Sequence, residues 1–442
     1  MRRRHFLSGA ALSAGGLLSG ARAASAADGP ASAPVAAPPG GTILEPAREV
    51  PVVAQADVVV VGGGPAGVAA AVAAARAGAS TILVERYNHL GGLWTGGLVL
   101  PLLATHGTGR DGKRRQVIAG LGGEMAQRLF GMKMAIHEID PVVDPEAAKY
   151  VLEEMIQAAG VRVLYHCWAA GVAAKDGVVK AVLVESKAGR VALVPKVVVD
   201  CTGDGDVFAW AGEAFDTMRY HIGLVHRLGN VDRVDKSKPG YKKMPLGDAT
   251  PLKSVNWVNM QGERNQDGLD LFNLSRLQQL YRLDIWKHVE QIRATPGHEE
   301  VFLLDTAPQL GVRASRILDG RYRLTFEDSM THKAFDDAIG VSGAWTSVSH
   351  GARKVGPGER PMWQIPYRSL VPKKTKNLLV AGRCFCFEKA LVEDARVIGA
   401  CLVTGHGAGA AAAVAVKAGA AVQDADVAAI RKTLLDQKAF LG

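Results

Sequence analysis

The sequence predicts an α/β fold in which a mostly parallel sheet carries a β-hairpin insertion and is interrupted by an inserted α+β segment. Three observations predict this fold. Residues 57–85 have the pattern of a strand, a helix and a second strand joined by glycines. Two later β-branched stretches, 197–206 and 377–383, also run into glycine. Residues 215–364, between those two stretches, lack the pattern. We therefore expect one domain from 56–214 and 365–442, and a second from 215–364.

The first strand and its glycine turn are the clearest part of the pattern. Val58–Val61 is a β-branched run without polar alternation, which is typical of a parallel strand covered on both faces. It ends in Gly62, Gly64 and Gly67. Their G-x-G-x-x-G spacing suits a tight turn, close approach of the backbone to a pyrophosphate, and packing of a helix on the strand. Because a helix N-terminus favours anions, the pattern predicts a Rossmann-like dinucleotide site.

The residue after the second strand narrows the choice of dinucleotide. Thr81–Val84 is the expected strand, and Glu85 follows where a carboxylate accepts hydrogen bonds from a ribose 2′-hydroxyl. An acid there disfavours a 2′-phosphorylated nicotinamide but suits both FAD and NAD. The alternative is a tight turn without a ligand. The agreement of both strands, the glycines, the helix and the acid favours a dinucleotide.

The composition is that of a globular protein rather than a disordered or fibrous one. Of 442 residues, 48% are hydrophobic and 21% are charged. The formal net charge is +9, but four of these charges lie in an N-terminal segment that we expect to be removed, which leaves +5. No basic block with interleaved aromatic residues remains, so we expect no nucleic-acid partner.

The N-terminus has the features of a targeting segment. Residues 1–23 combine a basic start, the pair Arg3-Arg4, a short Gly/Ala/Leu stretch and small residues suited to cleavage. They resemble a twin-arginine export signal, which predicts a protein exported already folded by the twin-arginine machinery and located in the periplasm or outside the cell. The alternative is a frayed cytosolic N-terminus. Residues 24–55, rich in Ala and Pro, predict a flexible linker.

Two further features bear on membranes and metals. The apolar runs are interrupted by glycine or too short for a transmembrane span, so we expect no transmembrane span.

The five cysteines are too few and too scattered for a disulfide scaffold, and only Cys384 and Cys386 are close in sequence. Two cysteines do not make a metal site, so we expect them to pack and expect no metal.

The chain after Glu85 contains glycine-rich segments that a simple NAD domain does not need. Residues 86–97 hold two glycine pairs around Trp94, and 200–206 read Asp-Cys-Thr-Gly-Asp-Gly-Asp. Glycine lets backbone run flush against an extended ligand. Other expected elements are a third parallel strand at 161–164, a hairpin of 178–184 with 191–194, a strand at 377–383, and an alanine-rich helix at 405–416 whose N-terminus faces an anionic flavin edge.

Taken together, these motifs resemble the FAD-dependent oxidoreductase family, whose fold is shared with fumarate reductase flavoproteins and glutathione reductase. The resemblance covers residues 56–420 and implies FAD as the cofactor. The matching segments are Val-Gly-Gly-Gly-Pro-Ala-Gly (61–67), Leu-Val-Glu-Arg (83–86), Leu-Gly-Gly-Leu-Trp-Thr (90–95), 200–206, Leu-Gly-Val-Arg-Ala-Ser-Arg (310–316), Ile-Pro-Tyr-Arg-Ser-Leu (365–370) and Asn-Leu-Leu-Val-Ala-Gly-Arg (377–383).

The resemblance also implies which residues hold the cofactor. The pyrophosphate would be bound by Gly62, Gly64, Ala66 and Gly67, and the adenosine ribose by Glu85. The cofactor would then run along Arg86, Gly91 and Gly92, with adenine against Ala169 and the adenosine half covered by Thr202 and Gly203. The ribityl chain would be reached by Gly382 and Arg383. The chain departs from the family in two places, since Arg383 stands where related proteins often have an acid and Ala314 where they have Glu.

The substrate side has no decodable motif. We expect residues 215–364 to cap the flavin, because ligand sites prefer junctions between domains. A helical stripe from Leu271 to Ile292 predicts core packing. Removing a hydride from carbon requires the attached O–H or N–H to lose a proton, which calls for a base or an anion-fixing cation. The candidates are His106, His350 and, third, His406, with Arg368 to fix a carboxylate or the flavin. For each, the alternative is a structural role.

Three functional hypotheses remain open. The first is an exported FAD enzyme that oxidises a small polar organic substrate and passes electrons to a quinone, a cytochrome or oxygen. The second is a reductase that, like fumarate reductase flavoproteins, reduces an unsaturated substrate with electrons from a separate partner; no Cys-x-x-Cys-His haem motif occurs in this chain. The third is a non-catalytic flavin-binding protein.

Overall fold

The computed structural model describes residues 42–442 except 261 and 344–360. Residues Val50–Gly442 form one unit, which contains every helix and strand given below. The predicted export signal, residues 1–23, lies outside the described residues and stays a prediction. Residues 42–49 contain no helix or strand.

A seven-stranded sheet organises the unit, in the order β7-β2-β1-β10-β9-β8, with β22 also paired to β10. Strands β7, β2, β1, β10 and β22 are parallel, whereas β9 is antiparallel to both of its neighbours. This confirms the predicted α/β fold. The strands are β1 (Val52–Val61), β2 (Thr81–Val84), β7 (Arg162–Leu164), β8 (Trp168–Lys175), β9 (Val178–Ser186), β10 (Gly189–Asp200) and β22 (Leu378–Val380).

Two strands differ from their predicted limits. β1 begins at Val52, inside the stretch 24–55 predicted as linker, because Val52 pairs with Ala192 of the long β10 even though it is itself exposed. β10 is one continuous strand, whereas the sequence predicted a hairpin arm at 191–194 and a separate strand at 197–200. At Pro195 it has left β9 and pairs with β1, which accommodates a residue without an N–H. The predicted hairpin itself is confirmed.

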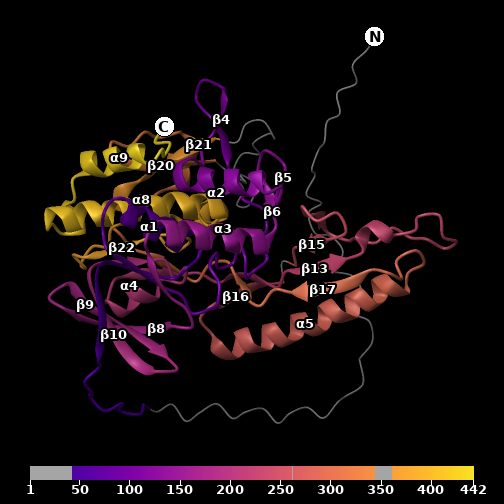
Figure 1. Ribbon diagram of the computed structural model, residues 1–442, viewed down its shortest axis with the longest axis horizontal. Coiled ribbons are helices and arrows are strands. Elements are labelled where there is room, and N and C mark those ends of the chain that lie inside the picture. Colours follow the sequence, from indigo (N-terminus) through magenta and orange to yellow (C-terminus); the bar gives the residue numbers. More distant parts are fainter. Residues whose placement is uncertain (1–41, 261, 344–360) are drawn as a thin grey trace. The chain divides into compact units, whose positions relative to one another are not determined.

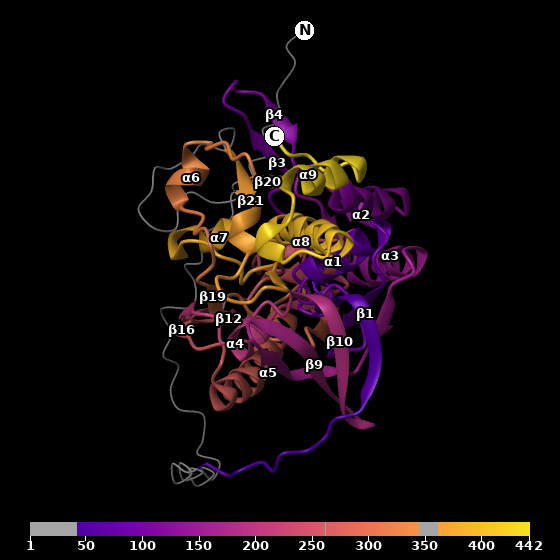
Figure 2. The same ribbon diagram turned by 90° about the vertical axis from the view of Figure 1, so that its left-hand side faces the viewer.

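Helices cover the sheet close to the first glycine turn. In Figures 1 and 2 the helices α1 (Pro65–Arg76), α2 (Gly120–Gly131), α3 (Pro145–Ala158), α8 (Ile398–Ala418) and α9 (Val427–Asp436) lie together above β1 and β10. α1 and α8 pack closely because both are rich in small residues. A Cβ added at Gly405 would lie 2.1 Å from the carbonyl oxygen of Ala66, and one at Gly409 would lie 2.1 Å from that of Ala70.

α8 is longer than predicted and mostly buried. It begins at Ile398 rather than at Gly405, because the glycines that read as a helix start lie in its interior and permit the contact with α1. His406 is therefore in the middle of the helix. Among the described residues α8 is the one helix long and apolar enough to cross a membrane, but 89% of its apolar window is buried inside the protein. A core helix of a globular protein passes the same test.

The inserted segment has a hydrophobic core of its own, which supports a mixed α+β architecture. Its helix α5 (Leu271–Ala294) buries Leu277, Tyr281, Ile285, Val289 and Ile292 against this core, as the stripe predicted, but Leu271 is 65% exposed, so its place in the predicted core is wrong. Figure 1 shows α5 beside the strands of this segment, which are β11 (Phe215–Thr217), β12 (Tyr220–Gly223), β13 (His226–Gly229), β14 (Asp248–Ala249), β15 (Asn256–Val258), β16 (Glu263–Gln266), β17 (Phe302–Thr306), β18 (Gly311–Val312) and β19 (Arg316–Leu318).

The remaining elements connect these parts. They are β3 (His106–Thr108), β4 (Arg114–Gln116), β5 (Ala135–Ile136), β6 (Val142–Val143), α4 (Asp206–Trp210), α6 (Phe326–Met330), β20 (Ala338–Gly343), β21 (Met362–Pro366), α7 (Val392–Ala395), and the 3-10 turns Val231–Arg233, Tyr367–Leu370, Lys389–Leu391 and Val422–Asp424. The division into 56–214, 365–442 and 215–364 stays a prediction. The core of the inserted segment combines residues between 222 and 307 with Leu98, Leu100 and Val142 from the earlier part of the chain, whereas buried residues after 313 join the main core.

Candidate functional site

The first glycine turn joins the end of β1 to the start of α1. Gly62 has a φ of +99°, and its N–H donates to the carbonyl of Val84 in β2 (2.8 Å). A Cβ at Gly67 would lie 1.7 Å from the carbonyl oxygen of Gly62, so only glycine allows the helix to start this close to the strand. A Cβ at Gly64, by contrast, would meet nothing within 4 Å. The turn therefore leaves empty space beside Gly64.

Glu85 is held at the end of β2, next to this turn. Its two carboxylate oxygens accept hydrogen bonds from the backbone N–H groups of Gly63 (2.6 Å) and Tyr87 (2.8 Å). The side chain is 5% exposed. These bonds fix the carboxylate but occupy only one lone-pair direction on each oxygen, so it can still accept hydrogen bonds from a ligand.

A second glycine turn lies beside the first, at the end of β10. The buried Asp200 accepts from the backbone N–H of Thr202 (3.0 Å), from its hydroxyl (2.7 Å) and from the N–H of Phe208 (3.0 Å). Burial raises the pKa of Asp200 to about 6, although these bonds oppose the rise. A Cβ at Gly62 would lie 2.5 Å from the carbonyl oxygen of Cys201, so the two turns touch.

An ion-pair network fixes the second turn to distant parts of the chain. Asp204 accepts from Arg383 (2.8 Å) and from the hydroxyl of Ser315 (2.6 Å), and Arg316 donates to the backbone carbonyl of Asp204 (3.0 Å) and to Asp206 (2.9 Å). Segment 310–316, whose contacts the sequence could not predict, thus reaches the second turn. Arg383 lies over Gly203, where a Cβ would be 2.2 Å from its Nη1.

These turns form one wall of a cleft that also borders the inserted segment. Its empty volume, including its opening to solvent, is about 1080 Å³. Of the predicted cofactor-binding residues, those that line it are Gly62, Gly64, Ala66, Glu85, Arg86, Gly92, Ala169, Thr202, Gly203, Gly382 and Arg383. Gly67 and Gly91 do not line it: Gly67 packs on Gly62, and the N–H of Gly91 donates to the carbonyl of Gly63 (2.8 Å). Binding by each of these residues stays a prediction.

Three buried N–H groups in this cleft have no hydrogen-bond partner among the described residues. They are Nε1 of Trp94, Nε of Arg383 and Nε of Arg396, and all three residues line the cleft. Buried donors without partners are rare in folded proteins. Together with the open space at Gly64 and the acceptor Glu85, the donors of Trp94 and Arg383 fit a ligand that carries hydroxyl groups at one end and acceptor atoms along its length, as FAD does.

The end of the cleft near Glu85 carries aromatic and cationic surface. The guanidinium of Arg86 lies 4.9 Å from the ring centroid of Tyr87 and 5.0 Å from that of Trp168. Trp168 is 55% exposed, yet it lines the cleft beside Ala169. A planar group can stack on such a surface. Sequence reasoning missed Trp168, which no motif marked.

The predicted catalytic residues that the structure describes, His106, His406 and Arg368, are not among the residues that line the cleft. His106, in β3, contacts the hydroxyl of Thr105 through Nδ1 (3.0 Å), and burial and the charge of Arg114 lower its pKa. His350 lies outside the described residues. His406 is buried in α8, where its Nε2 contacts Oε1 of Gln437 (2.8 Å) and burial lowers its pKa to about 4. A catalytic role for any of them stays a prediction.

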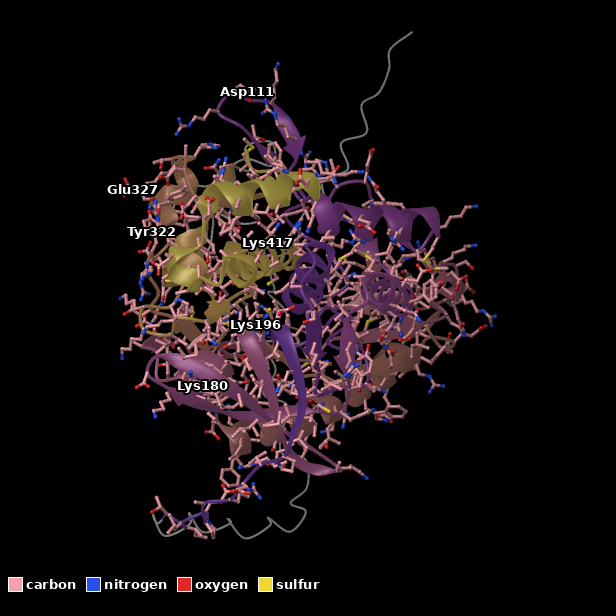
Figure 3. All side chains as sticks on the ribbon, turned by 60° about the vertical axis from the view of Figure 1, so that its left-hand side comes forward. Asp111, Lys180, Lys196, Tyr322, Glu327 and Lys417 are labelled. Carbon is pink, nitrogen blue, oxygen red and sulfur yellow. The ribbon has the colours of Figure 1, made fainter. Side chains whose placement is uncertain are left out.

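Arg368 is likewise placed in a local cluster rather than at the cleft. Its Nη2 lies 3.7 Å from Asp337, and its guanidinium lies 4.8 Å from the ring centroid of Tyr322. Tyr322 in turn donates to Asp328 of α6 (2.7 Å), and Figure 3 labels Tyr322 and the neighbouring Glu327 on this edge of the molecule. The contacts of Arg368 match the structural salt bridge that was the alternative to anion binding.

Some residues of the cleft that the sequence did not predict come from its cap side. Gln309, Leu310 and Val312 of the inserted segment line the cleft, as do Arg396 and Ile398, the first residue of α8. The N-terminus of α8 therefore does border the cleft, through Ile398 instead of the predicted Gly405. Leu310 and Val312 lie in the matching segment 310–316, but no pattern in the sequence indicated which of its residues would reach the cleft.

A comparison with family models identifies the family of the chain. A family model described as FAD dependent oxidoreductase matches residues 57–434. No curated protein matches the chain. Among solved structures, a geranylgeranyl bacteriochlorophyll reductase-like protein from Thermoplasma acidophilum has 17% identity and a TM-score of 0.45, over 86% of this chain and 82% of that one. The p-nitrophenol 4-monooxygenase PnpA from Pseudomonas putida DLL-E4 has 14% identity and a TM-score of 0.44, over 87% and 84%.

Proposed function

The chain belongs to the FAD-dependent oxidoreductase family and its cofactor is FAD, and from this premise we propose that it is an exported enzyme that oxidises a small polar organic substrate. The single observation that carries the proposal is the cleft, where the two glycine turns, Glu85 and three unpaired N–H donors meet the inserted segment. A pocket with both a cofactor wall and a cap wall suits a reaction between a bound cofactor and a small molecule.

The roles of this chain's residues follow from their positions. Glu85, oriented by two backbone N–H groups, would receive ribose hydroxyls, and the space beside Gly64 would admit the pyrophosphate. Trp94 and Arg383 would donate their unpaired N–H groups to acceptor atoms of the cofactor. When bound, FAD supplies the acceptor for a hydride. The cap residues Gln309 and Leu310 would shield the reacting carbon from water.

An absorbance spectrum of the purified mature protein tests the proposal. We expect a bound-flavin spectrum that bleaches when one pool of alcohols, amines, sugars or hydroxy acids is added without oxygen. Readmitting air, a quinone or a cytochrome then identifies the electron acceptor by the return of colour. A flavin that no pool bleaches, but that a reductant followed by an unsaturated substrate cycles, would instead indicate the reductase. Protein that holds flavin and reacts in neither direction would be a binding protein.

Export is the second part of the proposal, supported by the basic start and the Arg3-Arg4 pair of residues 1–23. Replacing both arginines by lysine keeps the charge but removes the pair that the twin-arginine machinery recognises. We expect the wild-type chain in the periplasmic or secreted fraction and the double variant in the cytoplasm with its flavin still bound. Equal distribution of the two proteins would show that residues 1–23 are no such signal.

A further inference from the structure

Two arginines, one lining the cleft and one next to its lining, carry a positive charge that the fold compensates only in part. Arg396 follows α7 and lines the cleft. Arg313 follows Val312, which lines the cleft from the inserted segment, and β18 pairs there with β12 through Val312 and Ile222. Tyr220 of β12, two residues before Ile222, donates to Glu393, which also accepts from Arg396, so β12 connects the two segments that carry these arginines.

The nearby carboxylate of Glu393 is already engaged. One of its oxygens accepts from Nη2 of Arg396 and the other from the hydroxyl of Tyr220 in β12. Nε of Arg396 is buried and has no partner among the described residues. Glu393 therefore offsets one positive charge of the pair and leaves donors unpaired on the cleft side.

Arg313 has no hydrogen bond or ion pair within the part of the chain that the structure describes, although its side chain is partly buried. Burial and the positive charge of Arg396 lower its pKa to about 10, which still leaves it charged at neutral pH. Burying a charge without a counter-ion is costly, and folded proteins rarely retain one without a reason. A missing anion is the simplest reason for both arginines.

We propose that Arg313 and Arg396 hold a carboxylate of the substrate, so that the enzyme acts on a compound bearing an anionic group next to the carbon it oxidises. Guanidinium groups present planar, paired donors that match a carboxylate. Val312 and Arg396 both line the cleft that the glycine turns and Glu85 also line, so an anion held there would share the cleft with the cofactor. The inference rests on the proposed function for the reaction itself, but anion binding can be measured without turnover.

Calorimetric titration of the flavin-loaded protein tests the inference with two probes of the same shape, acetate and acetamide. We expect saturable binding of acetate and at least about tenfold weaker binding of acetamide, because only acetate carries the charge. Arg313→Gln should weaken acetate binding about tenfold or more, because it removes the charge. Arg313→Lys should retain part of the affinity, since lysine keeps the charge but lacks the paired donors of the planar guanidinium group. Arg282→Gln, at an exposed position of α5, is the matched control and should change nothing.

Each contrary outcome is informative. Equal affinity for the two probes, or unchanged acetate binding in Arg313→Gln, would overturn the inference while leaving a flavoprotein with its proposed function. Loss of flavin from Arg313→Gln with acetate binding intact would also overturn it, because the arginine would then serve the cofactor. If Arg313→Gln does not fold by circular dichroism, Arg313→Lys and the comparison of probes decide. Wild-type protein without flavin would refute the proposed function, and the same titration would still report on the arginines.

Discussion

Replacing Gly64 by alanine separates the needs of the cofactor from those of the fold. Gly64 caps α1 with φ −68° and ψ −176°, a conformation that any residue adopts, and an added Cβ would meet no atom within 4 Å. Yet Gly64 lines the cleft, so the new methyl group would enter space that the pyrophosphate needs. We expect Gly64→Ala to fold normally and to bind FAD poorly.

The substitution should change the free energy of FAD binding more than the free energy of unfolding. In the free protein, alanine is a worse N-cap than glycine by roughly 0.5–1 kcal/mol, but it lowers the entropy of the unfolded chain by about 0.4–1 kcal/mol, so the free energy of unfolding should stay within about 0.5 kcal/mol. In the loaded protein, forcing a methyl group into a filled space costs about 1–3 kcal/mol. Since 1.4 kcal/mol is about tenfold in affinity, FAD should bind roughly 5- to 150-fold more weakly.

The assay compares urea unfolding of the flavin-free protein with FAD binding followed by quenching of flavin fluorescence. Gly131→Ala at the end of α2 is the matched control, because a Cβ there also meets nothing within 4 Å and the residue does not line the cleft. It should bind FAD like the wild type. Binding of FAD by Gly64→Ala within about twofold of the wild type would refute the assignment of this space to the cofactor. A stability loss in the flavin-free protein as large as the loss of binding energy would show that the glycine is needed by the fold.

Three further predictions test the core, its pH dependence and the ribose site. Gly405→Ala should lower the free energy of unfolding in urea by about 1–3 kcal/mol, because its Cβ would lie 2.1 Å from the backbone oxygen of Ala66. An unchanged midpoint of urea unfolding would mean that α1 and α8 can move apart to make room for the methyl group. His406 has a pKa of about 4 when folded against about 6.5 when unfolded, so the unfolded chain takes up a proton first and stability falls as pH drops from about 6.5 to about 4. His406→Gln should reduce this dependence of the unfolding free energy on pH, measured by urea unfolding at a series of pH values. If the free energy of the variant depends on pH as strongly as that of the wild type, other groups cause the dependence. Glu85→Gln should weaken FAD binding by about 1–3 kcal/mol in the same fluorescence titration, since it replaces a charged acceptor by a neutral amide; full affinity would exclude Glu85 from the site.

The fold was predictable where local pattern and tertiary environment agree. The run Val58–Val61 is buried on both sides in the structure, as its lack of polar alternation indicated. Glycine was harder to interpret, because it ends helices in solvent and also permits close packing inside them. Gly405 was read as the start of a helix, but it lies within α8 against Ala66. No local pattern distinguishes these uses, since the difference lies in a neighbour far away in the sequence.

The two walls of the cleft also differ in how far the sequence could predict them. The cofactor wall consists of contiguous motifs, so the sequence indicated Gly62, Glu85 and Gly203, and the structure places all three along the cleft. The cap wall is assembled from single residues of separate segments, and although Arg313 lies in the matching segment 310–316, that match indicated no role for it. General reasoning about bases selected histidines such as His106, which lies outside the residues lining the cleft.

What distinguishes a functional arginine from a structural one in this protein is its partner. Arg368 was chosen from the sequence, and its charge faces Asp337 and an aromatic ring. Arg313 was not chosen; it has no ion pair among the described residues, and the nearby Glu393 is shared by other donors. A paired charge stabilises the fold with or without ligand, whereas an unpaired one is stabilised only when an anion arrives. The substrate side of a flavoenzyme without a motif is therefore best sought among the charges that the fold leaves uncompensated.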